Sequence, residues 1–213
     1  MRAASDAALV MLTSPNNPTG DLVDPALVRR LLDETDALVM LDEAYIEFYG
    51  RTAVGLLSSH PNLIVARTFS KAYGLASARV GYMLASTAIV TMIEKAYMPY
   101  HMNVLSLATA DIVYQMRHEY VPRIQMMIAE RKRMSAELDK LPGVTVYPSE
   151  TNFVLIRYAK AAKLNEYLES KGIGVRCFGD APGLKNCLRI SMGLREENDQ
   201  WLDAIRQFVE GRA

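Results

Sequence analysis

Four short apolar runs in the first half of the chain limit most strongly what it can fold into. Their hydrophobicity is continuous rather than alternating, which is typical of strands buried on both faces of a parallel or mixed sheet. Between the first two runs we expect a helix from Asp24-Pro25 to about Glu34, since Asp is a favoured N-cap and Pro a favoured first helical residue. The pattern predicts an α/β fold. The runs are Ala8–Leu12, Ala37–Leu41, Asn62–Ala66 and Val80–Ala85.

The second half of the chain has a different pattern. A helix from Thr87 to about Tyr97 is followed by a mostly helical stretch from Asn103 to about Asp139, in which Pro122 is expected to cause a break or kink. Short strands then alternate with two helices, which predicts a small α+β unit. We place a domain boundary near Pro122, giving domains of residues 1–122 and 123–213. The expected strands are Val144–Tyr147, Asn152–Arg157 and Cys187–Ser191, and the helices are Ala161–Lys171 and Glu196–Glu210.

Composition excludes several classes of function. The chain of 213 residues carries 24 Lys and Arg against 24 Asp and Glu, so it lacks the basic excess of a nucleic-acid-binding protein. Two cysteines cannot form a disulfide framework, and we therefore expect a reducing, cytoplasmic setting. The longest uncharged runs are shorter than the roughly 18 residues that span a membrane. The three histidines, at positions 60, 101 and 118, lack metal-ligand spacing, so no metal is expected.

Polar residues of a particular kind follow the strand-like runs. In open α/β sheets, ligands bind beyond the carboxyl ends of the strands, so these residues form one candidate site. A lysine desolvated at such a place becomes a nucleophile able to bond covalently to a carbonyl compound. Pyridoxal phosphate enzymes need that lysine together with a carboxylate that keeps the pyridine nitrogen protonated. Lys71 and Asp42 are the candidates for these two roles.

The same cofactor makes two further demands that the sequence meets. Its phenolic oxygen needs hydrogen-bond donors, and the amide of Asn17 and the phenol of Tyr45 are suitable. Its phosphate needs hydroxyl groups and a guanidinium fork. These are supplied by Thr68, Ser70 and Arg79.

Each of these residues, taken alone, also has a plain structural interpretation. An asparagine in a dense turn sequence is commonly a turn residue, and an aspartate after an apolar run often caps a helix or pairs with a cation. A single tyrosine is commonly a core or rim aromatic, a single lysine a solvated charge, and a single arginine an ion-pair partner. The interpretation as a cofactor site therefore depends on the combination.

The combination also resembles a known family. The segments SPNNPTG, LDEAY and RTFSKAYGLASARVGY look like the fold-type I aminotransferases of class I/II, and within them most resemble the histidinol-phosphate aminotransferases. The later segments YMPYHMNVLSLATA, TNFVLIR and CLRISMGLREEN are similar to the same family. The resemblance covers essentially the whole chain. It implies part of a pyridoxal-phosphate-binding large domain, a mostly parallel sheet with flanking helices, followed by a small α+β domain.

The resemblance implies a role for each residue of the set. Lys71 would bind the cofactor covalently and shuttle the proton, and Asp42 would pair with the pyridine nitrogen. Asn17 and Tyr45 would bind the phenolic oxygen, and Thr68, Ser70 and Arg79 the phosphate. It adds two substrate-binding residues: Arg189 would hold the anionic end of the substrate, and Asn152 would lie near the substrate. Taken alone, Arg189 is also consistent with a structural ion pair, and Asn152 with a turn or strand-end residue. One departure is visible: the family's Ala-Gly-Leu-Arg is replaced by Ala76-Ser77-Ala78-Arg79, so the local loop packing is expected to differ.

The resemblance further implies the reaction. We expect transfer of an amino group between histidinol phosphate, or an aromatic amino acid, and 2-oxoglutarate, in a homodimer. A decarboxylase of a phosphorylated amino acid and an inactive aminotransferase fragment remain alternatives. Because the chain begins where the family is already in mid-domain, we expect an incomplete enzyme that binds the cofactor weakly and transaminates poorly by itself.

Overall fold

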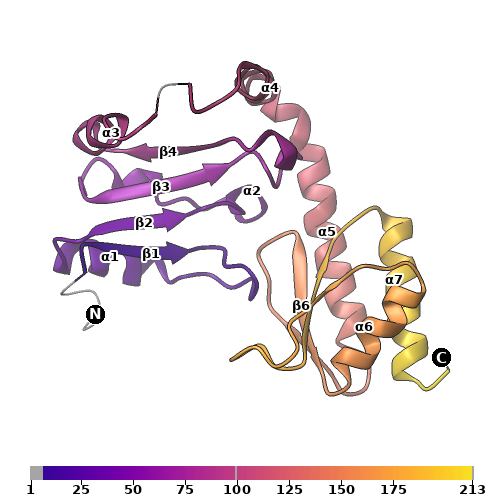
Figure 1. Cartoon of the computed structure of the whole chain (residues 1–213). Coiled ribbons are helices and arrows are strands. Elements are labelled where there is room, and N and C mark those ends of the chain that lie inside the picture. The colour runs from indigo at the N-terminus through magenta and orange to yellow at the C-terminus, as the bar shows by residue number, and fades with distance from the viewer. Residues whose placement is uncertain (1–6, 99, 213) are drawn as a thin grey trace. The chain divides into compact units, whose positions relative to one another are not determined.

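The computed structural model describes residues 7–98 and 100–212, which form two compact units (Figure 1). The first unit contains the described residues up to 16 and residues 22–122, and the second contains residues 17–21 and those from 123 onward. The first six residues of the predicted domain 1–122 lie outside the described residues.

A four-stranded sheet of order β1-β2-β3-β4 forms the first unit. Strands β1 (Leu9–Thr13), β2 (Leu38–Asp42) and β3 (Leu63–Thr68) are parallel, and β4 (Gly81–Ala85) runs antiparallel to β3. All four apolar runs are therefore strands, and the predicted α/β class with a mostly parallel sheet is confirmed. Gly81 is required by a close approach: a Cβ atom there would lie 2.8 Å from the carbonyl oxygen of Arg67 on β3.

Helix α1 (Pro25–Glu34) forms where the sequence predicts it, and it packs on this sheet. Its N-cap Asp24 accepts a hydrogen bond from the amide of Ala26, and Pro25 takes the first helical position. The apolar face of the helix joins the central strands in one core, in which each buried Val or Leu contributes roughly 1.5–3 kcal/mol. That core contains Val28, Leu31, Leu32, Val39, Leu41, Leu63 and Val65.

The long helical stretch is broken earlier than the sequence predicts. Helix α3 (Thr87–Glu94) precedes α4 (Val104–Gln115), and a short 3-10 helix (Arg117–Tyr120) separates α4 from α5 (Val121–Leu138). Pro122 is thus the second residue of α5. The physical reason is that the first turn of a helix has no backbone acceptor for its amides, so a residue without an N–H is tolerated there.

The second unit is an antiparallel sheet of order β5-β6-β8-β7, packed on helices. Its strands are β5 (Val144–Tyr147), β6 (Phe153–Tyr158), β7 (Arg176–Cys177) and β8 (Cys187–Ser191). Helices α6 (Ala161–Ser170) and α7 (Arg195–Val209) share one apolar core with α5 and the two central strands. Fully buried members of that core include Met134, Leu138, Val154, Ile156, Leu164, Leu168, Leu188 and Ile205.

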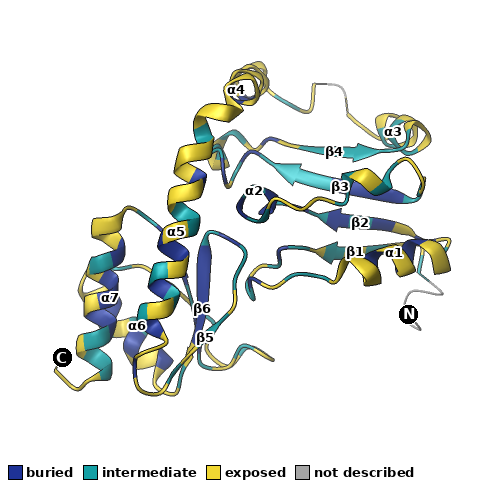
Figure 2. Ribbon diagram, turned by 180° about the vertical axis from the view of Figure 1, so that it is seen from behind, coloured by how far each residue is buried: buried dark blue, intermediate teal, exposed yellow. Residues whose placement is uncertain are grey.

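Apolar side chains are exposed on several elements of the first unit. Met11 on β1 is 64% exposed, and α4 carries Val104 and Leu105 at 75% and 76% (Figure 2). None of the described helices is long and apolar enough to cross a membrane.

Candidate active site

The carboxyl ends of β2 and β3 place four of the predicted site residues close together. Asp42 ends β2 and Thr68 ends β3, and the parallel pairing sets Asp42 beside Ala66. Ser70 and Lys71 follow Thr68 directly in the chain. An open depression of about 360 Å³ lies at this edge of the sheet. Its walls include these four residues, Asp42, Thr68, Ser70 and Lys71, and also Arg79.

Asp42 is fixed by its own backbone neighbours. Its Oδ1 accepts a hydrogen bond of 2.8 Å from the amide of Ala44, and the amide of Glu43 donates to the carbonyl oxygen of Ala66 at 2.8 Å. The half-buried carboxylate is thus held at the strand end in one orientation. A preorganised acceptor of this kind suits a protonated ring nitrogen.

The side chains of Lys71 and Tyr45 lie close together. The Lys71 Nζ atom is 5.5 Å from the centroid of the Tyr45 ring, a cation–π distance. Tyr45 is 5% exposed and directly precedes the short helix α2 (Ile46–Tyr49). Lys71 itself is exposed, which corrects the expectation of a desolvated lysine. The reason is the open depression, which leaves the ammonium group in contact with solvent.

The loop after β3 uses two of its predicted phosphate-binding residues to hold its own shape. The Thr68 hydroxyl accepts a hydrogen bond from the amide of Ser70 at 3.0 Å and donates to the carbonyl oxygen of Val80 at 3.4 Å. Arg79 has left-handed backbone, with φ of 57°, and its Nη1 donates to the carbonyl oxygen of Ala76 at 3.0 Å. The 3-10 helix Ala76–Ala78 fills the place of the family's Gly-Leu and ends at this strained arginine.

An ion pair that the sequence interpretation missed lies next to this site. Glu43 is 1% exposed, and its carboxylate accepts hydrogen bonds from Arg67 at 2.8 and 3.0 Å, from Thr52 at 2.8 and 3.0 Å, and from the amide of Ala53 at 2.7 Å. Arg67 directly precedes Thr68, and Glu43 directly follows Asp42. The sequence does contain a signal for this ion pair: an acid and a base stand at corresponding ends of two neighbouring strands. Successive side chains of a strand face opposite sides, so Glu43 and Arg67 can meet on the face away from their neighbours Asp42 and Thr68.

A second acid, the half-buried Glu47, lies on helix α2. Burial raises the pKa of Glu47, and its Oε2 has no hydrogen-bond partner among the described residues. Burial also raises the pKa of Tyr73 to about 12, with the nearby Glu47 charge acting in the same direction. Tyr73 packs between the rings of Phe69 and Tyr120, at centroid distances of 5.5 and 5.4 Å.

The predicted substrate residues belong to the second unit, together with Asn17. Arg189 on β8 donates from Nη1 to Oδ1 of Asn17 at 2.5 Å, although the two residues are 172 positions apart. Its guanidinium lies 5.2 Å from the centroid of the Phe153 ring, and its buried Nε has no hydrogen-bond partner among the described residues. Asn152 is half-buried, and its carbonyl oxygen accepts from the amide of Met192 at 2.8 Å.

Arg189 therefore has no acidic partner in the described part of the chain, which disfavours the interpretation as a structural ion pair. A guanidinium with a free, buried N–H can accept an anion without first losing another ion pair. The structure thus groups Asp42, Thr68, Ser70, Lys71 and Arg79 in the first unit and Asn17 and Arg189 in the second. No group of three or more candidate metal ligands is present among residues 7–98 and 100–212.

Comparison with known proteins agrees with this chemistry. The model of the family "aminotransferase class I and II" matches residues 2–205. The chain belongs to this family. The histidinol-phosphate aminotransferase of Thermoanaerobacter sp. (strain X514) is 40% identical over 202 residues, a match that covers 94% of this chain and 57% of that protein. The chain thus spans somewhat more than half the length of the curated relatives that it matches.

Solved structures of two enzymes resemble the chain closely. The histidinol-phosphate aminotransferase from Sinorhizobium meliloti, in complex with pyridoxal-5'-phosphate, has a TM-score of 0.85 and 32% identity, covering 98% of this chain and 59% of that one. An L-threonine-O-3-phosphate decarboxylase from Porphyromonas gingivalis has a TM-score of 0.86 and 28% identity, covering 97% and 66%. The mixed α/β architecture of this chain is that of these enzymes.

Proposed function

We propose that the protein containing this chain transfers an amino group, with pyridoxal 5'-phosphate as cofactor, between histidinol phosphate or an aromatic amino acid and 2-oxoglutarate. The observation that carries the proposal is the depression lined by Asp42, Thr68, Ser70, Lys71 and Arg79. Family membership supports the reaction class, and the names of the relatives support the substrate. We also propose a cytoplasmic homodimer, as the resemblance implies.

The donor set of the depression fits this cofactor. The wall carries a carboxylate, an ammonium, two hydroxyls and the guanidinium of Arg79, which match a pyridinium, an aldehyde and a phosphate. The second guanidinium of the wall, that of Arg67, is already paired with Glu43. Pyridoxal phosphate, when bound, supplies an electron sink for the bonds around the substrate's α-carbon. Asp42 would hold the proton on the ring nitrogen, and Ser70 and Arg79 would bind the phosphate. Tyr45 would donate its phenolic hydrogen to the ring oxygen.

Lys71 would have two tasks in this reaction. Its amine would hold the cofactor covalently, and it would also accept and donate the proton at the substrate's α-carbon. The Tyr45 ring, whose centroid is 5.5 Å from Nζ, would help to position the lysine side chain for both tasks.

The anionic end of the substrate would bind to Arg189. Its Nη1 already donates to Asn17, while its Nε has no partner among the described residues, so one donor of the fork is available without loss of an existing contact. Asn152 directly precedes Phe153, whose ring lies against the Arg189 guanidinium. It would contact the substrate from the start of β6. Asn17 retains its amide N–H₂ as a donor for the cofactor's ring oxygen.

The similarity to an L-threonine-O-3-phosphate decarboxylase gives a second candidate, decarboxylation of a phosphorylated amino acid. One experiment separates the two reactions. Histidinol phosphate with 2-oxoglutarate, and in parallel O-phosphothreonine, are incubated with the chain and pyridoxal phosphate, and glutamate and carbon dioxide are measured. Glutamate formation that Lys71→Ala abolishes supports transamination. Lysine-dependent carbon dioxide release without glutamate contradicts it, and no product in either incubation supports the inactive fragment.

A further inference from the structure

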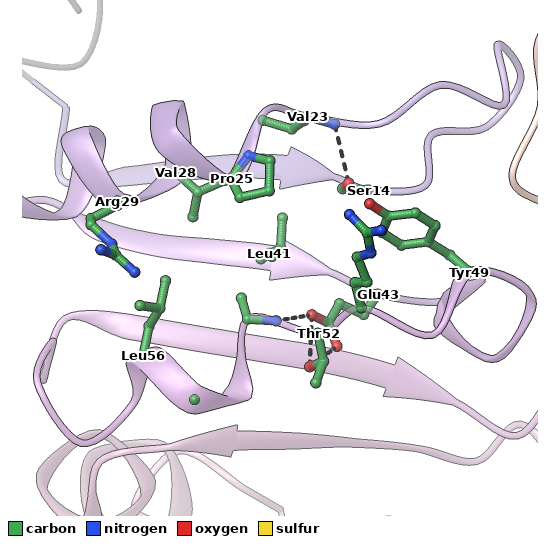
Figure 3. Close-up of a pocket in the computed structure, with 13 residues that line it drawn as sticks. Ser14, Val23, Pro25, Val28, Arg29, Leu41, Glu43, Tyr49, Thr52 and Leu56 are labelled. Atoms are coloured by element: carbon green, nitrogen blue, oxygen red, sulfur yellow. Dashed lines mark hydrogen bonds between the residues drawn. The ribbon is translucent and has the colours of Figure 1, made fainter.

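A second cavity lies on the other side of the first unit's sheet. It has a volume of about 480 Å³ and is formed by α1, the ends of β1 and β2, and the turn at Val54–Leu56 (Figure 3). It shares no lining residue with the depression around Lys71. Leu41 and Glu43 face it, whereas Asp42 between them faces the depression, as alternation along a strand requires. The cavity is therefore separate from the proposed catalytic site.

The walls of this cavity are mainly apolar. Val28 of α1, Leu41 of β2 and Leu56 of the turn point into one shared space in Figure 3, and Val23 and Pro25 close one side. A volume of this size is within the range of small-molecule sites, in which apolar walls surround a few polar groups. The apolar part of the cavity thus suits a compact hydrocarbon or aromatic body.

The charge balance of the cavity is positive. Arg29 and Arg51 line it, both exposed, and neither has an ion-pair partner within the described part of the chain. In Figure 3, Arg29 lies at one end of the labelled group and Tyr49 at the other, and the Arg51 guanidinium lies 5.9 Å from the Tyr49 ring centroid. Among the described residues that line the cavity, Glu43 is the only acid, and its carboxylate is already bound by Arg67, Thr52 and the Ala53 amide.

We propose that this cavity binds a small organic acid with an aromatic or branched apolar body. The carboxylate pairs with Arg51 beside Tyr49, and the body packs on Val28, Leu41 and Leu56. A guanidinium and a phenol at the end of an apolar cavity recognise an acid over its neutral analogue, because an uncharged end group leaves the cation unpaired. This site goes beyond the proposed transamination, since it uses none of the residues assigned to that reaction.

The test measures binding of 3-phenylpropanoate by isothermal titration calorimetry at pH 7, with 3-phenylpropan-1-ol as the neutral analogue. For about a dozen heavy atoms we expect a Kd on the order of 1 mM, and an affinity for the alcohol weaker by about tenfold. Arg51→Gln should weaken binding of the acid by about tenfold. Arg123→Gln, an exposed arginine of the second unit, is the matched control and should leave binding unchanged.

A second variant tests the apolar wall. Leu56→Trp fills the cavity and should abolish binding, and far-ultraviolet circular dichroism reports whether the variant is folded. Lys71→Ala should bind the acid normally, so failure at this site is distinguishable from failure of the proposed function. The proposal is overturned if the alcohol binds as tightly as the acid, if Arg123→Gln weakens binding as much as Arg51→Gln, or if no saturable binding occurs up to about 10 mM.

Discussion

Arg67 donates two hydrogen bonds, of 2.8 and 3.0 Å, to the same carboxylate oxygen of the fully buried Glu43, and thereby ties the carboxyl end of β3 to that of β2. Each of these residues adjoins a candidate site residue, Thr68 and Asp42. A buried ion pair gives little net stability over an apolar pair, but removal of one partner leaves the other charge uncompensated. The main effect of the pair on stability should therefore appear when one partner is removed and the other charge is left buried.

Glu43→Gln should lower the free energy of unfolding by about 3 kcal/mol, since Arg67 would then lie beside a neutral amide. Urea unfolding followed by circular dichroism measures the change. Glu34→Gln is the control, because Glu34 makes an exposed pair with Arg30 and its loss should cost less than about 0.5 kcal/mol. Equal effects of the two substitutions would show that the buried pair has no special role.

Glu47 should make stability depend on pH. Burial raises the pKa of its carboxyl, so the folded state holds the proton more tightly than the unfolded chain, whose reference pKa is 4.5. Its favourable contribution is complete below that value and is lost as pH rises through the raised pKa. Glu47→Gln should therefore raise Tm at pH 7 and leave it nearly unchanged at about pH 4. Glu166→Gln, on an exposed face of α6, should show no such difference.

A side chain at Gly20 should destabilise the second unit. It has φ of +81°, and a Cβ atom would lie 2.5 Å from Oγ of Ser149, which donates to the carbonyl oxygen of Phe153 at 2.7 Å. Gly183 has a similar φ of +76° with open space around it. Gly183→Ala should cost about 1 kcal/mol from backbone strain alone, and Gly20→Ala about 2 kcal/mol more from the clash. Thermal unfolding would contradict this account if the two variants were equally stable.

Arg79 should act on the phosphate of the cofactor and not on its ring. Arg79→Ala is expected to weaken binding of pyridoxal phosphate by about tenfold, the loss of one charge-assisted contact. Binding of pyridoxal, which lacks the phosphate, should not change. Absorbance titrations with both compounds measure the two affinities. A parallel loss for both would indicate that the substitution disturbs the loop and not the phosphate contact.

Much of the fold follows from local patterns that the sequence displays directly. The apolar runs and their polar ends predicted the strands of the first sheet and the place of Asp42 and Lys71, because continuous hydrophobicity is typical of strands in a parallel or mixed sheet. The expected burial on both faces does not hold for β1, where Leu9 and Met11 are exposed. Contacts between distant residues were not visible in this way. The Arg189–Asn17 hydrogen bond joins residues 172 positions apart, and no local period reports such a pairing. The end of α4 at Gln115 was missed because Pro122 is compatible with the first turn of a helix.

The most direct test of the central claim is to identify the lysine that bonds to the cofactor. The chain is saturated with pyridoxal phosphate, reduced with borohydride to fix the carbon–nitrogen bond, digested, and examined by mass spectrometry. We predict that the added mass lies on Lys71, and that Lys71→Ala loses it while Lys132→Ala, at an exposed position of α5, keeps it. Label spread over surface lysines, with no preference for Lys71, would contradict the account.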